Sequence, residues 1–193
     1  MFEYHLYTID GTTTLENHQT KQLVLFPPVQ VKASKKYTYD ASKSARNVAV
    51  TYEFKNKGVT GADAPLPGGR VRVYKKGEQG VPLFLGEDRL SPTPQGGQVR
   101  LYVGDAFDVK GERVQKARRS LGKKGWEETW QVKLRNHKRD DVRVSVVEHL
   151  NPNWKIVRAS HDYTQRDART IVFDVKVPAD GETVIDYQVE YAR

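Results

Sequence analysis

Apolar side chains at every second position are the feature that most constrains how this sequence can fold. Between residues 98 and 103, Val99, Leu101 and Val103 alternate with Gln, Arg and Tyr, and the same pattern recurs at 47–55, 129–135, 142–146, 171–177 and 185–191. Such alternation is typical of strands with one buried and one wet face. Because no segment shows sustained helical periodicity, we expect an all-β protein with less than about 10% helix.

Turn residues separate these runs and indicate how the chain is divided. Pro and Gly are concentrated at 67–69 (PGG), 92–97 (PTPQGG) and 178–181 (PADG). We expect antiparallel β-sandwich units, with residues 1–106 as an N-terminal β-sandwich unit and residues 107–125 as a basic hairpin connection. Residues 126–193 contain regularly spaced strand patterns and predict a C-terminal immunoglobulin-like β-sandwich, although the cysteine pair of true immunoglobulin domains is missing.

The composition excludes several classes of protein. The chain has no cysteine, which rules out disulfides, thiolate metal sites and cysteine nucleophiles. No apolar run approaches the roughly 18 residues of a membrane-spanning helix, so the protein is not expected to be transmembrane. Residues 1–5 are neither basic nor apolar enough for a signal peptide.

Catalytic and metal-binding constellations are not apparent in the sequence. Residues 160–162 (SHD) contain the three residue types of a hydrolase triad, but adjacent residues of an extended chain point to opposite faces. Asp105, Asp108 and Glu112 do not follow a calcium-loop spacing. No pair of histidines has zinc-ligand spacing; the five are His5, His18, His137, His149 and His161. We therefore expect no enzyme activity, no cofactor and no metal.

Positive charge is concentrated in one part of the chain. The net charge is +8, and residues 110–140 hold eleven basic and four acidic residues, so most of the excess lies there. The candidate polyanion-binding residues surround one turn: Lys116, Arg118, Arg119, Lys123, Lys124 and Trp126. They could attract an anionic glycan or lipid surface, or form a solvated hairpin end that discourages edge-to-edge aggregation. Stacking aromatics are sparse nearby, so specific nucleic-acid binding is not expected.

Three tryptophans are candidates for an aromatic platform that stacks on a sugar ring. Trp130 falls on the apolar face of its strand and is expected in the core, whereas Trp126 stands at the loop edge and is the better surface candidate. Trp154 follows a turn and is expected to cap the sandwich. A core or capping role is favoured for the set, and a carbohydrate site is the alternative.

Several stretches carry a resemblance to a known family. They are residues 2–7 (FEYHLY), 17–22 (NHQTKQ), 66–74 (LPGGRVRVY), 84–89 (FLGEDR), 103–109 (VGDAFDV) and 134–138 (LRNHK). With these stretches the chain resembles the bacterial domain of unknown function 4139, the C-terminal half of mucoidy-inhibitor-A-like envelope proteins. The resemblance spans almost the whole chain.

The resemblance implies an extracytoplasmic protein of the cell envelope, and it supplies no catalytic motif that could be carried over. Members often have an upstream region with coiled-coil character. The function expected on these grounds is a structural or interaction module that contacts a protein or an envelope polymer. A carbohydrate- or polyanion-binding module is the alternative, and a hydrolase is a remote third.

Overall fold

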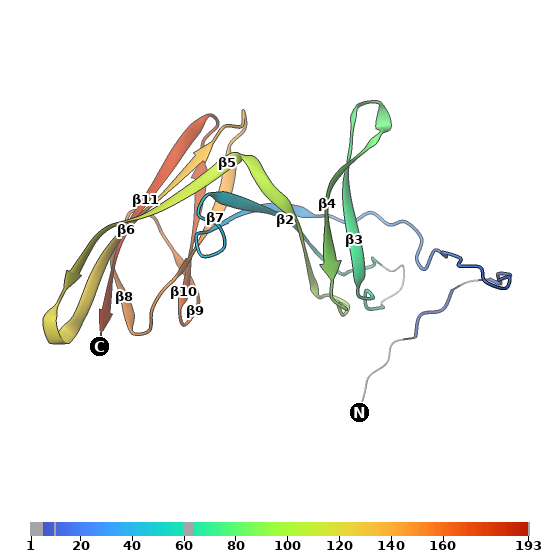
Figure 1. The fold of residues 1–193 in the computed structure, drawn as a ribbon, viewed down its shortest axis with the longest axis horizontal. Helices are drawn as coiled ribbons and strands as arrows, with labels where there is room; N and C mark the ends of the chain where they lie inside the picture. The colour runs from blue at the N-terminus through green and yellow to red at the C-terminus, as the bar shows by residue number, and fades with distance from the viewer. Residues whose placement is uncertain (1–5, 10, 60–63, 193) are drawn as a thin grey trace.

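Strands dominate the computed structural model, which describes residues 6–9, 11–59 and 64–192. Strands hold 59% of these residues and helix 3%, so the prediction of an all-β fold is confirmed. Two 3-10 turns, η1 (Glu78–Gly80) and η2 (Gly122–Lys124), are the helical segments of this described part. The strands, drawn in Figure 1, are β1 (Ser34–Asp40), β2 (Asn47–Lys55), β3 (Gly69–Lys76), β4 (Pro82–Leu90), β5 (Gln98–Ser120), β6 (Gly125–Asn136), β7 (Val142–His149), β8 (Trp154–Ala159), β9 (Thr164–Asp167), β10 (Thr170–Val177) and β11 (Gly181–Ala192).

Nine of these strands form one sheet in the order β8-β11-β6-β5-β2-β1-β7-β10-β9. The sheet curls over so that its two ends face each other as a sandwich, and Phe173 of β10 contacts Tyr187 of β11 with ring centroids 5.6 Å apart. All neighbouring strands run antiparallel except β1 and β7, which are parallel. This pairing departs from the purely antiparallel expectation. It is possible because the two strands are far apart in sequence and need no tight hairpin.

The division of the chain at residues 106 and 107 is not what the structure shows. That boundary falls inside β5, whose first half pairs with β2 and whose second half pairs with β6. Tyr39 and Val48, from β1 and β2, pack in the same buried cluster as Val132 and Leu134 of β6. Apolar residues of β1 and β2 face that cluster, so the described residues before 106 form no separate sandwich. Residues 107–120 are the second half of β5, and the turn η2 joins them to β6.

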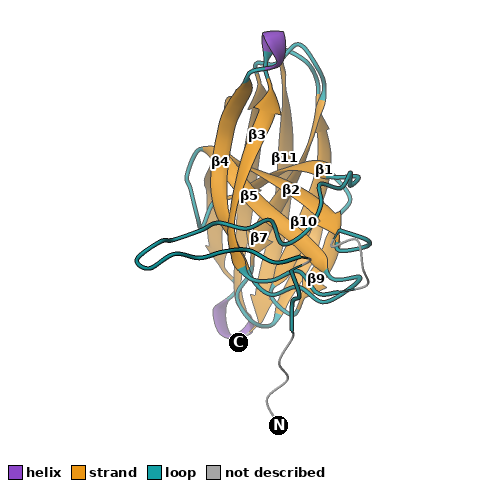
Figure 2. Ribbon diagram, turned by 90° about the vertical axis from the view of Figure 1, so that its right-hand side faces the viewer, coloured by secondary structure: helices purple, strands orange, loops and turns teal. Residues whose placement is uncertain are grey.

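A two-stranded sheet, β3-β4, stands beside the large sheet and is crossed by the start of β5 (Figure 2). Gly86 of β4 lies directly against the backbone of Val103, where any side chain would collide. The carboxylate of Asp88 accepts a hydrogen bond from the Tyr102 backbone N–H at 2.8 Å. Leu66, Val99 and Leu101 form a second, smaller core under this hairpin.

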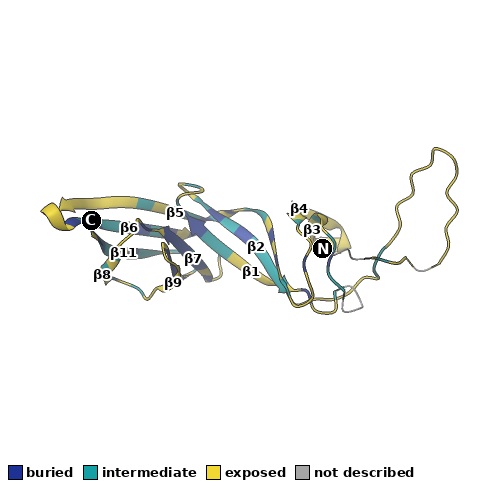
Figure 3. Cartoon of the chain, turned by 90° about the horizontal axis from the view of Figure 1, so that it is seen from below, coloured by how far each residue is buried: buried dark blue, intermediate teal, exposed yellow. Residues whose placement is uncertain are grey.

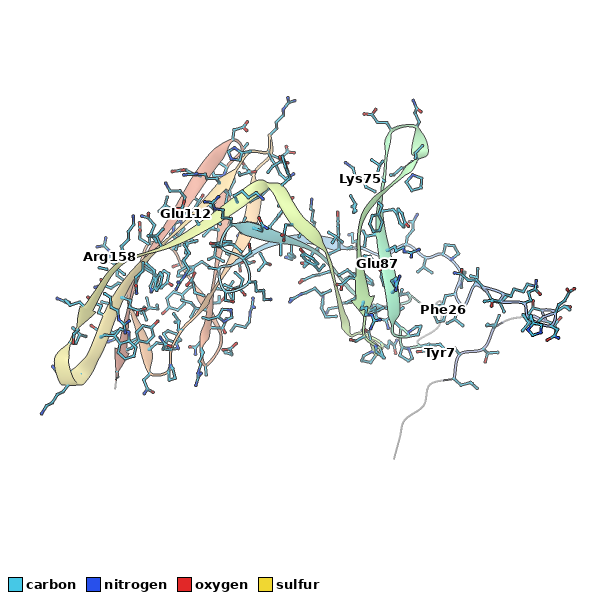
Figure 4. The ribbon with its side chains drawn as sticks, in the orientation of Figure 1. Tyr7, Phe26, Lys75, Glu87, Glu112 and Arg158 are labelled. Atoms are coloured by element: carbon cyan, nitrogen blue, oxygen red, sulfur yellow. The ribbon has the colours of Figure 1, made fainter. Side chains whose placement is uncertain are left out.

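The described residues before β1 form no strand. They run as an extended arm, almost entirely exposed in Figure 3, which returns to the β3-β4 hairpin near Tyr7 and Phe26 (Figure 4). The Tyr7 hydroxyl donates a hydrogen bond to the Pro65 carbonyl at 3.1 Å, and its ring meets Phe26 edge-on at 5.9 Å. In the part of the chain that is described, no helix is both long and apolar enough to cross a bilayer.

Candidate functional site

The predicted basic tip is the far end of the hairpin formed by β5 and β6, closed by the turn η2 (Figure 1). Lys116, Lys123 and Lys124 are exposed there, and none of them forms an ion pair with any described residue. These three lysines are therefore available to a ligand. The end of the hairpin thus projects beyond the neighbouring strands and carries its lysines on the surface.

The two arginines of the tip have structural partners that sequence reasoning missed. Arg118 lies 3.6 Å from Glu128, and Arg119 lies 3.1 Å from Glu127. Both glutamates are only 7% exposed, so the arginines compensate carboxylates that water reaches poorly. The register of the hairpin could have predicted these ion pairs, because each arginine stands directly opposite its glutamate once β5 continues to the tip. The five predicted cations are consequently not equivalent.

Trp126 does not stand on open surface beside the lysines. Its ring is half-buried and stacks on Tyr191 with centroids 5.0 Å apart, and its indole N–H donates to Glu128 at 3.1 Å. The Arg118 guanidinium lies 5.4 Å from the ring centre. The expectation that Trp126 is the exposed aromatic of the tip is corrected accordingly, because the ring fills the edge of the core.

A buried ionic cluster in the sandwich was not anticipated from the sequence. Glu148 is 1% exposed and accepts hydrogen bonds from Arg113 Nε at 2.8 Å and from the Tyr187 hydroxyl. The Arg113 guanidinium stacks on Trp130, 3.3 Å from the ring centre. Burial raises the pKa of the Glu148 carboxyl, although Arg113 acts to lower it. The sequence gives only a weak indication of this cluster: position 148 continues the every-second-residue pattern of buried side chains at 142–146.

A second carboxyl, Asp40, contacts two residues, Ser42 and His149, that line a small cavity beside this cluster. Asp40 accepts a hydrogen bond from the Ser42 hydroxyl at 2.6 Å and contacts the His149 ring at 3.1 Å. Burial acts to raise the pKa of Asp40, but the hydrogen bonds from Ser42 and His149 lower it overall. The cavity has a volume of about 170 Å³, and Arg113, Glu148 and His149 are among its lining residues.

The other sequence candidates are not brought together. Ser160 Oγ lies 2.9 Å from His161 Nδ1 on an exposed loop, and Asp162 makes no hydrogen bond or ion pair within the described residues. Asp105 accepts from Asn47 at 2.9 Å, while Asp108 pairs with Lys138 at 3.4 Å. Among the described residues no three His, Asp or Glu side chains form a metal-binding group. His5 lies outside the described residues.

A surface of large apolar side chains lies on and beside the β3-β4 hairpin. The exposed members on the hairpin are Tyr74, Val81, Leu83, Phe84 and Leu85. Phe107 of β5 is 89% exposed and lines, with Leu85, a groove of about 240 Å³ between the hairpin and the sandwich. Lys35, Asp108 and Lys138 are polar lining residues of this groove. Hereafter this set of six apolar residues is called the hairpin surface.

Comparisons with protein-family models, with curated proteins and with solved structures found no match. The resemblance described above therefore stays a prediction.

Proposed function

We propose that this protein is a non-catalytic interaction module of the bacterial cell envelope, and that it binds a partner protein through the hairpin surface. The observation that carries this proposal is the set of five large exposed apolar side chains on one short hairpin, of which Leu85 lines a groove together with the exposed Phe107. Scattered single apolar residues are normal on a soluble protein, but a contiguous set rimmed by polar residues marks an interaction site. The envelope location rests on the family resemblance.

The chemistry of the hairpin surface is that of a protein interface. Val81 and Phe84 are each 58% exposed, and Tyr74 meets Phe84 edge-on with ring centroids 5.5 Å apart. Aromatic residues of this kind supply the central anchors of interfaces, and the charged residues form the rim. The arm before β1 also exposes large apolar side chains, including Leu15 and Val24. The immunoglobulin-like character expected of residues 126–193 belongs to the same proposal, since such sandwiches serve in many cell-surface proteins.

Site-specific photo-crosslinking in the native cells tests this proposal. A photoreactive phenylalanine analogue is placed at Phe84, at Phe107 and, as the matched control, at Val114, an exposed apolar position on the second half of β5. We expect one adduct of defined mass from Phe84 and Phe107, none from Val114, and loss of the Phe107 adduct when Val81→Ser and Leu83→Ser are added. Equal adducts at all three positions, or none, would contradict the proposal.

A second candidate function is binding of an anionic polymer by the tip of the β5-β6 hairpin. The observation that favours it is the set of three exposed lysines, Lys116, Lys123 and Lys124, without ion pairs among the described residues. Binding by such a set is electrostatic, tolerant of the polymer's sequence and strongly salt-dependent. Retention on immobilised heparin at increasing salt, with the three lysines changed to Ser, tests this candidate. Earlier elution is expected, and unchanged elution contradicts it. The control changes Lys32, Lys55 and Lys57, which are exposed elsewhere, to Ser.

A further inference from the structure

The two free edges of the large sheet line one groove. β8 is hydrogen-bonded only to β11 and β9 only to β10 among the described strands, so each presents one unpaired edge. The groove has a volume of about 600 Å³ and is lined by Trp154 and Ile156 of β8, by Tyr163 just before β9 and by Gln165 of β9. β8 and β9 lie in the part of the molecule away from the β3-β4 hairpin (Figure 1).

Backbone groups of β8 point toward this groove. The Ala192 N–H donates to the Asn153 carbonyl at 2.9 Å, which makes the next pair, Trp154 and Tyr191, a non-hydrogen-bonded pair of the antiparallel ladder. Ile156 lies two residues further along β8, so its pair with Val189 is also a non-hydrogen-bonded pair. The N–H and C=O groups of Trp154 and Ile156 therefore face away from β11 and toward the open edge.

The aromatic walls of the groove are fixed before any ligand binds. The Trp154 indole N–H donates to the Ala168 carbonyl at 2.8 Å, a contact that spans from β8 to the β9-β10 turn. The Tyr163 ring packs edge-on against Phe173 with centroids 5.8 Å apart. Because side chains that are already held lose little freedom on binding, such walls favour affinity.

The segment of chain around the groove carries net positive charge, and Lys155 is the charged residue that lines the groove itself. Residues 154–169 contain two acidic and four basic residues, the latter being Lys155, Arg158, Arg166 and Arg169. None of the four side chains forms an ion pair within the described part of the chain. Asp167, one of the two acids, already accepts a hydrogen bond from the Arg169 backbone N–H at 2.8 Å. A negatively charged occupant is therefore favoured.

We propose that the groove between β8 and β9 binds an extended acidic peptide segment of another protein as an added strand. Neighbouring strands of a sheet lie about 4.8 Å apart, so the added strand pairs with the free edge of β8 and continues the sheet beyond it. Hydrogen bonds between the peptide backbone and the backbone of Trp154 and Ile156 supply affinity, and every second side chain of the peptide contacts Trp154 or Tyr163. This site is separate from the hairpin surface and is independent of the function proposed for it.

The test uses a short capped peptide in which Glu and Val alternate, titrated into the full chain while backbone amide signals are followed by nuclear magnetic resonance. Shifts are expected at Trp154, Ile156 and Gln165. Two matched peptides are the controls: one with Lys in place of Glu, and one N-methylated at alternate residues, which keeps its side chains but loses hydrogen bonds along one edge. Both are expected to bind at least tenfold more weakly.

Two protein variants separate strand addition from side-chain contact. Ile156→Pro removes an N–H that points to the open edge, whereas Ile156→Ala removes the same packing and keeps that N–H. The Pro variant is expected to bind at least tenfold more weakly than the Ala variant, with folding of both checked by circular dichroism. Equal binding by the two variants, no shifts on β8 and β9, or shifts produced by heparin fragments but not by the peptide would each overturn the proposal.

Discussion

Glu148 and Arg113 show how a single residue pair can determine both the stability of this sandwich and its dependence on pH. The carboxylate lies between the two layers, and its partners come from β5 and β11. A buried charge is tolerated only when it is paired and hydrogen-bonded, so each member of the pair depends on the other.

Removing one partner of this pair is expected to be far more harmful than removing both. Arg113→Met leaves a carboxylate with 1% exposure and without its counter-ion, and the free energy of unfolding should fall by about 3–5 kcal/mol. The double change Arg113→Met with Glu148→Leu replaces both charges by apolar groups and should recover most of that loss. Urea denaturation of the three proteins measures this, and a double variant no better than the single one contradicts it.

Two buried carboxyls are expected to give opposite slopes of stability against pH. The folded-state pKa of Glu148 is raised, so its contribution is present below the unfolded value of about 4.3 and is lost as the pH rises through the folded value. The folded-state pKa of Asp40 is lowered, so its contribution is present above about 3.9 and is lost as the pH falls. The free energy of unfolding of the wild type minus that of Glu148→Gln should therefore fall with rising pH. The same difference taken against Asp40→Asn should increase with rising pH. Denaturation at several acidic pH values checks both signs.

The β5-β6 hairpin combines two kinds of cation within one element. Arg118 and Arg119 compensate Glu128 and Glu127, whereas the three lysines of the tip project without ion pairs among the described residues. Structural and binding roles can therefore be separated within one hairpin.

Changing Arg118 and Arg119 to Ser together is expected to lower the free energy of unfolding by about 1–3 kcal/mol. The reason is that the two glutamates they neutralise are nearly buried, although the arginines themselves are well exposed and partly screened. Changing the three tip lysines to Ser should leave stability within about 0.5 kcal/mol of the wild type. Thermal unfolding of the two variants side by side is the measurement, and equal melting temperatures would show that the arginines are not structural.

The alternation of apolar residues predicted most of the strands, but it did not predict which strands pair with each other. Val132 and Leu134 alternate in the sequence and are fully buried, as expected. The parallel pairing of β1 with β7 joins segments that are far apart in sequence, and so does the ion pair between Arg113 and Glu148. Neither could be predicted, because the alternation of apolar residues contains no information about which strand lies next to which. Alternation does not predict the second half of β5 as strand, because this exposed part carries charged residues on both faces.

At the scale of the whole molecule, the core is common to both halves of the chain. Tyr39 and Val48 are completely buried against residues of β6, β7 and β10. The chain before residue 106 therefore completes the sandwich that the later strands begin.

A fragment of residues 126–193 is expected to remain unfolded by itself. It lacks β5 and β1, which pair with the edges of β6 and β7, and it lacks the core side chains Tyr39, Val48 and Val50 of β1 and β2. Their loss leaves a gap in the core and two unpaired strand edges that invite aggregation. Circular dichroism and amide exchange of the fragment, compared with the full chain, measure this; a fragment with cooperative unfolding and protected amides would restore the division expected from the sequence.

The continuity of β5 has a mechanical consequence. One strand of 23 residues pairs with β2 along its first half and with β6 along its second, and it bends at Gly104, whose φ of +131° glycine adopts readily. A pull applied along β5 between the two ends of the molecule loads many ladder hydrogen bonds at once, in shear. A pull at the free end of β8 would instead open its ladder bond by bond. The protein should therefore resist tension along its long axis far better than peeling from its edge.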